Sequence, residues 1–148
     1  MVETTQGLDD IYNLIESKLL SFIANYKANN YRECVTALFY VAGGLARYIL
    51  ATRGYFPISH EGIQVLLAQH FIKSGTVKKN IYNYLTNLYM RRKDADYKGF
   101  IAFDNDDIQT YWQWIVEIVD ELQNFFDEIH KQKTDELIAE GKNLLLNR

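Results

Sequence analysis

Residues 91–97, with the sequence Arg-Arg-Lys-Asp-Ala-Asp-Tyr, hold the densest group of side chains that could take part in chemistry. An arginine guanidinium binds phosphate through two parallel hydrogen bonds, and a carboxyl group can accept or deliver a proton. Arg92 and Asp96 are one helical turn apart, so their spacing favours an intrahelical ion pair, with a catalytic pair as the alternative. A carboxyl beside Arg92 would stay ionised at neutral pH, which makes it a poor proton donor. Two more cations and a ring suited to nucleic-acid binding lie next to this pair: Arg91, Lys93 and Tyr97.

The charge of the chain is distributed unevenly along the sequence. Residues 73–98 carry seven basic and two acidic side chains, a net charge of +5, within a chain whose total is −3. Residues 104–140 carry eleven acidic and two basic side chains, a net charge of −9. The basic segment therefore favours phosphate groups as partners, although two solvated faces of opposite charge explain the same pattern.

The histidines give no sign of a metal site. His60, His70 and His130 have no spacing typical of metal ligands, and the sequence holds no glycine-rich phosphate loop, so we expect neither a metal nor another cofactor. Arg53 and His60 lie near each other in the sequence, but a loop with Gly54 and Pro57 lies between them, so chance explains this spacing better than a paired role does. We expect His60 to bond to the start of the following helix or to Asp96.

The composition and the periodicity of the chain predict one helical domain over residues 1–148. Of the 148 residues, 48% are hydrophobic and one is proline, so a sizeable core and long helices are both possible. Apolar residues recur every three to four positions, and no stretch alternates in the way that strands do. The sequence therefore predicts an all-α, up-and-down antiparallel bundle of four to five main helices.

The expected helices follow one another with short turns between them. They cover residues 8–28 (within an N-terminal segment 1–30), 31–53, 60–71, 79–96, and from a cap at Asp104 to Ile129. The turns are marked by helix-ending and helix-capping residues: Asn29-Asn30, Gly54 and Ser59. The C-terminal tail, residues 131–148, is expected either to continue the fifth helix or to form a short sixth helix.

The second expected helix is the most apolar segment. Residues 34–51 approach the length of a membrane span, but Arg47 and Thr36 interrupt them, so we expect a buried core helix and no membrane. Gly43-Gly44 would let another backbone approach this helix closely and would suit a dimer. The single cysteine, Cys34, predicts a buried thiol in a reducing cytoplasm, and no signal peptide is visible in residues 1–10.

Three segments, taken in their order along the chain, resemble the HEPN superfamily. They are Ala37-Leu38-Phe39-Tyr40 leading to Arg53-Gly54, Ser59-His60-Glu61-Gly62-Ile63, and Arg92-Lys93-Asp94-Ala95-Asp96-Tyr97. The last one is similar to the Arg-x-x-Ala-Asp-Tyr signature at the end of the fourth helix in an uncharacterised prokaryotic branch of the superfamily. The resemblance covers roughly residues 31–126, which is most of the chain.

The resemblance implies a helical bundle that often dimerises. Many members of the superfamily are RNA-cleaving toxins or defence proteins, and many lie beside a minimal nucleotidyltransferase that acts as antitoxin. In the ribonucleases, an arginine near the end of the penultimate long helix is followed by a histidine one to two turns later. Arg92 matches that arginine, but no histidine follows it before His130, and Asp96 and Tyr97 occupy the nearby positions.

We therefore expect a HEPN-type component of a prokaryotic toxin–antitoxin or defence module, with ribonuclease activity left open. It would bind RNA or a nucleotide through Arg91, Arg92, Lys93, Tyr97 and His60, with Arg92 and Asp96 as the candidates for catalysis. The alternative is a non-catalytic dimerisation or interaction module whose partner is a minimal nucleotidyltransferase. A homodimer in the cytoplasm is expected in either case.

Overall fold

The computed structural model describes residues 2–148, and the side chains from residue 7 onward. Six α-helices follow in order: α1 (Val2–Lys27), α2 (Tyr31–Thr52), α3 (His60–Leu67), α4 (Lys79–Tyr97), α5 (Asn105–Leu122) and α6 (Glu128–Leu146). A π-helical turn, Ala68–Ile72, extends α3, and a 3-10 turn, Gln123–Phe125, follows α5. No strand occurs in residues 2–148, which confirms the all-α prediction.

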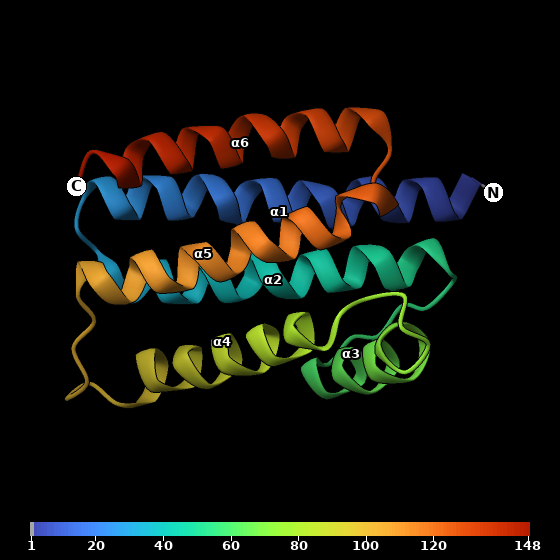
Figure 1. Cartoon of the computed structure of the whole chain (residues 1–148), viewed down its shortest axis with the longest axis horizontal. Helices are drawn as coiled ribbons and strands as arrows, with labels where there is room; N and C mark the ends of the chain where they lie inside the picture. The colour runs from blue at the N-terminus through green and yellow to red at the C-terminus, as the bar shows by residue number, and fades with distance from the viewer. Residues whose placement is uncertain (1) are drawn as a thin grey trace.

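The long helices run up and down in alternate directions (Figure 1). Helix α2 lies at the centre and packs against α1, α3, α4 and α5, while α6 lies along α1. The short α3 lies at one end, beside the start of α4. The arrangement is therefore an antiparallel bundle built around α2.

Helix α2 is a core helix in this bundle, as its apolar composition predicts. It is the one helix in residues 2–148 that is long and apolar enough to cross a membrane, but 83% of its most apolar window is buried against the other helices. Such burial is typical of the core helix of a globular protein. Cys34 lies fully buried in α2, and burial raises the pKa of its thiol to about 12.

Local signals placed most of the helix ends correctly. Ser59 accepts a hydrogen bond from the Gly62 amide and begins α3, and Gly54 ends α2 with a positive φ of 85°. Asp104 and Asp107 form a capping box that begins α5. Asn29 makes the expected turn with a φ of 61°, whereas the Asn30 side chain forms no capping hydrogen bond.

The predicted fifth helix is wrong at its C-terminal end. It ends at Leu122 instead of continuing to Ile129, and the tail forms a separate sixth helix that already begins at Glu128. Phe126 turns into an extended conformation and packs edge-on against Tyr48, with 4.7 Å between the ring centroids. Asp127 then accepts a hydrogen bond from the His130 amide at 2.8 Å and caps α6. The gain from burying Phe126 and from this cap explains why the chain reverses here. The first helix also begins earlier than predicted, at Val2 instead of Leu8.

Two glycines allow close packing between helices. A Cβ on Gly44 would lie 2.6 Å from Cγ1 of Ile15. The side chain of Ile15 on α1 therefore packs directly on the backbone of α2 at Gly44, within one molecule. The expected close approach of another helix occurs at Gly44, where Cβ of Ile15 on α1 also lies 3.9 Å from the Cβ position, whereas Gly43 has nothing within 4 Å of its Cβ position. In the same way, a Cβ on Gly141 would lie 2.4 Å from the Trp112 ring, which α6 covers. The glycine pair thus gives no argument for a dimer.

Candidate functional site

A cleft of about 260 Å³ opens beside the centre of α2, where α1, α4 and the start of α3 meet it. Its basic side chains are Arg47, His60 and Arg92. Its aromatic lining consists of Phe39, Tyr40 and Tyr89. Leu14, Ile58 and Ile63 add apolar surface, and Gly43, which has nothing within 4 Å of its Cβ position, leaves the floor open. We call this the Arg92 cleft.

The Arg92 cleft is suited to an anion that carries a flat apolar group. Two arginines and a histidine line it, and no carboxylate does so among the side chains that the structure describes. Guanidinium groups bind phosphate oxygens in pairs, and aromatic faces bind the rings of bases. The volume is close to the lower end for small-molecule pockets, about 300 Å³. A single nucleotide unit fits such a site better than a duplex does.

Arg92 is held on three sides. Its Nε lies 2.8 Å from Oδ2 of Asp96, one turn further along α4. The two side chains form an ion pair, but the N–H does not point at the carboxylate well enough to count as a hydrogen bond. Its Nη2 donates to the Tyr40 hydroxyl at 3.3 Å. The guanidinium carbon lies 5.6 Å from the centre of the Phe39 ring, within the range of cation–π attraction. These contacts hold the charge at the edge of the cleft, with donors left over for a ligand.

His60 forms the opposite wall of the Arg92 cleft. Its ring stacks on Tyr89 with 3.9 Å between the centroids, and it is tilted against Phe39 at 5.5 Å. Burial is the main cause that lowers the pKa of His60; the Glu61 charge raises it in part, and the Arg92 charge lowers it by less than Glu61 raises it. The imidazole is therefore neutral at pH 7.

Polar atoms without partners gather at this cleft. Among the described residues, three buried side-chain nitrogen or oxygen atoms form no hydrogen bond: His60 Nδ1, Gln64 Oε1 and Arg92 Nε. His60 and Arg92 line the cleft, and Gln64 contacts His60. Buried polar atoms that lack partners are costly and rare in native proteins. Arg92 Nε is paired with Asp96, so the two of these atoms without any partner are His60 Nδ1 and Gln64 Oε1, and together with the basic lining they mark this cleft as a candidate ligand site.

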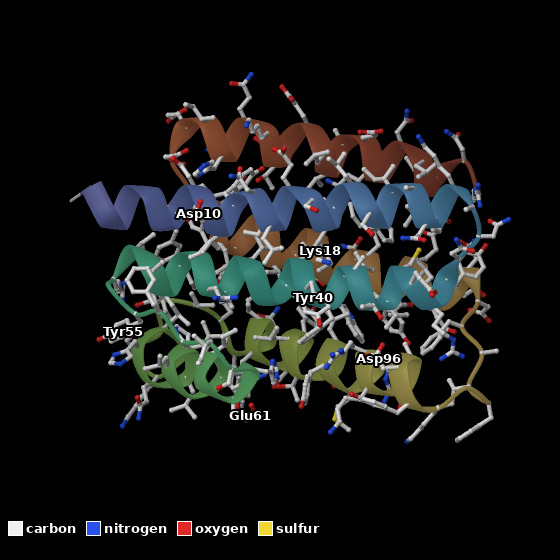
Figure 2. The ribbon with its side chains drawn as sticks, turned by 180° about the vertical axis from the view of Figure 1, so that it is seen from behind. Asp10, Lys18, Tyr40, Tyr55, Glu61 and Asp96 are labelled. Atoms are coloured by element: carbon white, nitrogen blue, oxygen red, sulfur yellow. The ribbon has the colours of Figure 1, made fainter. Side chains whose placement is uncertain are left out.

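A second, more polar cleft of about 380 Å³ lies on the other side of Tyr40. Figure 2 shows Tyr40 on α2 between Lys18 of α1 and Asp96 of α4. Lys18 Nζ lies 5.0 Å from the centre of the Tyr40 ring, and Arg92 contacts the same ring from α4. Arg32 also lines this cleft, but its guanidinium donates to the carbonyl oxygens of Ala95 and Ile101 and thereby holds the end of α4. Tyr40 therefore joins two clefts along one face of the bundle.

The structure brings together only some of the residues that the sequence singled out. Arg92 and His60 line the Arg92 cleft, and Asp96 pairs with Arg92 from the second cleft, but His60 bonds to Gln64 and not to Asp96. Arg91 pairs with Asp94 of the same helix at 3.1 Å and lies near Trp114 of α5, away from the cleft.

The remaining two predicted binding residues are exposed. Lys93 lies 5.2 Å from the centre of the Tyr89 ring, outside the lining of the cleft, and Tyr97 is 76% exposed at the end of α4. Arg53 lies over the Phe71 ring and does not line the Arg92 cleft with His60. This agrees with the expectation that the spacing of Arg53 and His60 is due to chance.

Sequence reasoning missed three residues that shape the site. Tyr40 and Arg47 line the cleft from α2, and Gln64 supports His60 from α3. Arg47 had a visible signal, since it is a lone charge in an otherwise apolar helix. Gln64 had none, because its role depends on how α3 lies against α4.

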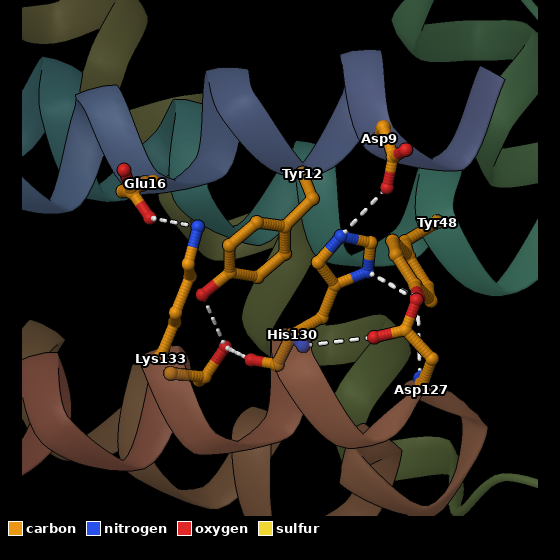
Figure 3. Close-up of polar contacts among 8 residues, drawn as sticks. Asp9, Tyr12, Glu16, Tyr48, Asp127, His130 and Lys133 are labelled. Atoms are coloured by element: carbon orange, nitrogen blue, oxygen red, sulfur yellow. Dashed lines mark hydrogen bonds and ion pairs between the residues drawn. The ribbon is translucent and has the colours of Figure 1, made fainter. Parts of the chain in front are cut away.

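A second polar cluster joins α1, α2 and α6 (Figure 3). The buried His130 ring lies between two carboxylates, with Nε2 3.0 Å from Asp9 and Nδ1 3.1 Å from Asp127. Nδ1 also lies 2.8 Å from the Tyr48 hydroxyl, and Tyr12 stacks on the ring at 4.3 Å. Ligand atoms of Asp9, Asp127 and His130 come within 4.8 Å of one another. However, the two carboxylates lie at different ring nitrogens, which one ion could not use together, so the contacts fit a structural link between helices.

The comparisons with known proteins give distant relatives. No family model matches the chain. A protein of Thermotoga maritima named "UPF0332 protein" is 21% identical over 124 residues, which cover 84% of this chain and 86% of that protein. A protein of Methanocaldococcus jannaschii named "Putative toxin MJ0142" is 24% identical over 103 residues, which cover 68% of this chain and 70% of that protein. The chain is thus similar to small prokaryotic proteins, one of which is named as a toxin.

Proposed function

We propose that this chain is a HEPN-type component of a prokaryotic toxin–antitoxin or defence module that binds RNA or a nucleotide in the Arg92 cleft. The observation that carries the proposal is the lining of that cleft, which combines Arg47, His60 and Arg92 with aromatic rings and open space over Gly43. The toxin name of a distant relative supports the same role.

In this proposal, the two arginines bind phosphate and the aromatic rings bind a base. Arg92 and Arg47 come from different helices, so they would hold a phosphate from two directions. Tyr40 and Phe39 would bind the base or sugar, as aromatic side chains do for single-stranded nucleic acids. Asp96 neutralises Arg92 until a phosphate arrives.

Binding fits this site better than cleavage does. Cleavage of RNA by its own 2′-hydroxyl needs a general base and a general acid near the phosphate. Asp96 is held in the ion pair with Arg92, and Nε2 of His60 contacts Gln64. We therefore assign phosphate binding to Arg92 and the role of its counter-ion to Asp96. Cleavage of RNA by the purified protein would add ribonuclease activity to this proposal.

The test compares two neighbouring arginines. Purified wild type, Arg92→Ala and Arg91→Ala are titrated into a labelled single-stranded RNA and into labelled 5′-AMP at several salt concentrations, with gels to detect cleavage. Arg92→Ala should weaken binding by roughly tenfold or more, and should lower the salt slope for RNA by about 0.7. Arg91→Ala, which removes the same charge from the other side of α4, should have a much smaller effect. Equal effects of the two variants, or no binding by wild type, would overturn the proposal.

The alternative, a non-catalytic module that dimerises or binds a minimal nucleotidyltransferase, has one observation in its favour. The rim of the cleft carries exposed apolar side chains, with Ile58 95% and Leu14 43% exposed. Exposed apolar surface beside a polar site is typical of protein contacts. Light scattering from micromolar to near-millimolar concentration tests for the homodimer, and Ile58→Asp should dissociate it if this rim is the contact.

A further inference from the structure

The connections of His60 show how its two ring nitrogens are used. Gln64 Nε2 lies 3.3 Å from His60 Nε2, one turn later in α3, and it also donates to the Thr86 hydroxyl at 3.0 Å. The Thr86 hydroxyl in turn donates to the carbonyl oxygen of Tyr82 at 3.1 Å. These contacts form one chain of hydrogen bonds from α4 through α3 to the imidazole.

The direction of this chain follows from the number of protons available. A threonine hydroxyl has one proton, and Thr86 gives it to Tyr82, so its oxygen must accept from the amide nitrogen of Gln64. The second proton of that nitrogen then points to His60 Nε2, which has to be the acceptor. The opposite orientation of the amide would leave an NH₂ group, with two donors, buried without a partner, which is less favourable than an unpaired carbonyl oxygen.

A neutral imidazole whose Nε2 accepts a hydrogen bond carries its proton on Nδ1. Burial lowers the pKa of His60 and keeps the ring neutral, with an opposing effect of Glu61 and a smaller lowering effect of Arg92. Nδ1 is buried and has no partner among the described residues. It is therefore an unused N–H donor in the wall of a cleft whose charged side chains are two arginines.

We propose that His60 is a ligand-binding residue that donates a hydrogen bond from Nδ1 to a phosphate oxygen in the Arg92 cleft, and that Gln64 and Thr86 are the positioning residues that hold it in this tautomer. The inference rests on the proposed function, because it takes the cleft as the phosphate site. Because Nδ1 lies below the surface, a small shift of a neighbouring side chain has to expose it when the ligand binds. The long side chain of Arg92, whose charge acts on His60, is the candidate for that shift.

The first part of the test reads the tautomer directly and needs no ligand. Nitrogen-15 NMR of the histidine side chains at pH 7.5, assigned with His60→Phe, should show the proton of His60 on Nδ1. Gln64→Met removes the amide donor without adding charge, so the Nε2–H tautomer should gain population. A wild-type ring with its proton on Nε2, or a charged ring, would overturn the inference even where RNA binding is intact.

The second part measures binding of 5′-AMP and of a single-stranded oligoribonucleotide. His60→Phe keeps an aromatic ring for Tyr89 and loses the donor, so affinity for both probes should fall roughly tenfold or more. His60→Asn keeps an amide N–H near the position of Nδ1 and should retain more of the affinity. Far-ultraviolet circular dichroism checks that both variants are folded.

The outcomes separate the two proposals. If His60→Phe binds both probes like wild type while Arg92→Ala does not, Nδ1 donates no hydrogen bond to the ligand. The role of His60 is then overturned, and the proposed function stands. If wild type binds neither probe, the proposed function fails, and the role of His60 fails with it. If His60→Phe loses affinity for the oligoribonucleotide alone, the oxygen that accepts from Nδ1 belongs to the RNA backbone. If it loses affinity equally for both probes, that oxygen belongs to a phosphate that both probes have.

Discussion

Arg92 and Asp96 form an ion pair one turn apart in α4, with Nε and Oδ2 2.8 Å apart, so the arginine that faces the cleft carries its own counter-anion. A phosphate has to compete with this carboxylate for the guanidinium. Asp96→Asn should therefore strengthen binding of 5′-AMP or RNA several-fold, because it removes the competing charge. The free energy of unfolding should fall by only about 0.5 kcal/mol, as for other partly exposed pairs at this spacing.

The control for this prediction is Asp94→Asn, which changes the net charge by the same amount. Asp94 pairs with Arg91 and Lys98, away from the cleft, so its removal should leave affinity nearly unchanged. Fluorescence anisotropy at constant salt measures both. If Asp96 instead took part in catalysis, Asp96→Asn would lower RNA cleavage without raising affinity, and the assignment as a counter-ion would be wrong.

The neighbouring glycines of α2 should respond in opposite ways to alanine. Gly44→Ala would place a methyl group 2.6 Å from Cγ1 of the fully buried Ile15, and such overpacking costs roughly 1–3 kcal/mol. Gly43→Ala meets nothing within 4 Å and should stabilise the helix by up to about 1 kcal/mol. Urea denaturation of the two variants measures the difference. Equal changes in stability would contradict the account of how α1 packs on α2.

The helices could be predicted because the signals for them are local. A cap such as Ser59 or Asp104 forms its hydrogen bonds within three residues, and apolar periodicity reports the buried face of one helix. The end of α5 was missed for the same reason. Phe126 and Ile129 continue the apolar period of α5, and the gain that reverses the chain comes from packing of Phe126 on Tyr48, which is distant in sequence.

The candidate site could be predicted only in part. Arg92 was found from residue type and spacing, and Tyr40, Gly43 and Arg47 share one face of α2 by their spacing. Which helix this face meets depends on the tertiary fold, so their contact with α4 and with His60 could not be deduced from periodicity. The hydrogen bonds that run from Thr86 through Gln64 to His60 link two helices and have no signature in the sequence.

Cys34 should be unreactive in the native protein. Burial raises the pKa of its thiol to about 12, so almost no thiolate forms at pH 8, and the sulfur is inaccessible within α2. A thiol reagent should label the protein no faster than it unfolds, and a moderate concentration of urea should speed the labelling. Complete labelling within the mixing time in 8 M urea is the control. Fast labelling without denaturant would contradict the burial of this helix.

The last prediction concerns the effect of pH on stability through His60. Its pKa in the folded protein is lowered from 6.5, chiefly by burial; the Glu61 charge opposes this shift, and the weaker effect of the Arg92 charge adds to it, so the unfolded chain binds a proton more readily than the folded one. The free energy of unfolding therefore falls as the pH drops from 6.5 through the lowered pKa of the folded state, and this contribution is constant above that interval. His60→Phe removes the group, so its stability should fall less between pH 7 and pH 5 than that of wild type. The slope of Arg92→Ala should lie between the two and close to that of wild type, because burial, the main cause of the lowered pKa, remains and only the smallest contribution is lost. Urea titrations at several pH values compare the slopes and do not depend on the starting stability of each variant. Three parallel slopes would show that His60 titrates alike in the folded and unfolded chains, and the neutral, buried imidazole on which the Nδ1 donor depends would then be refuted.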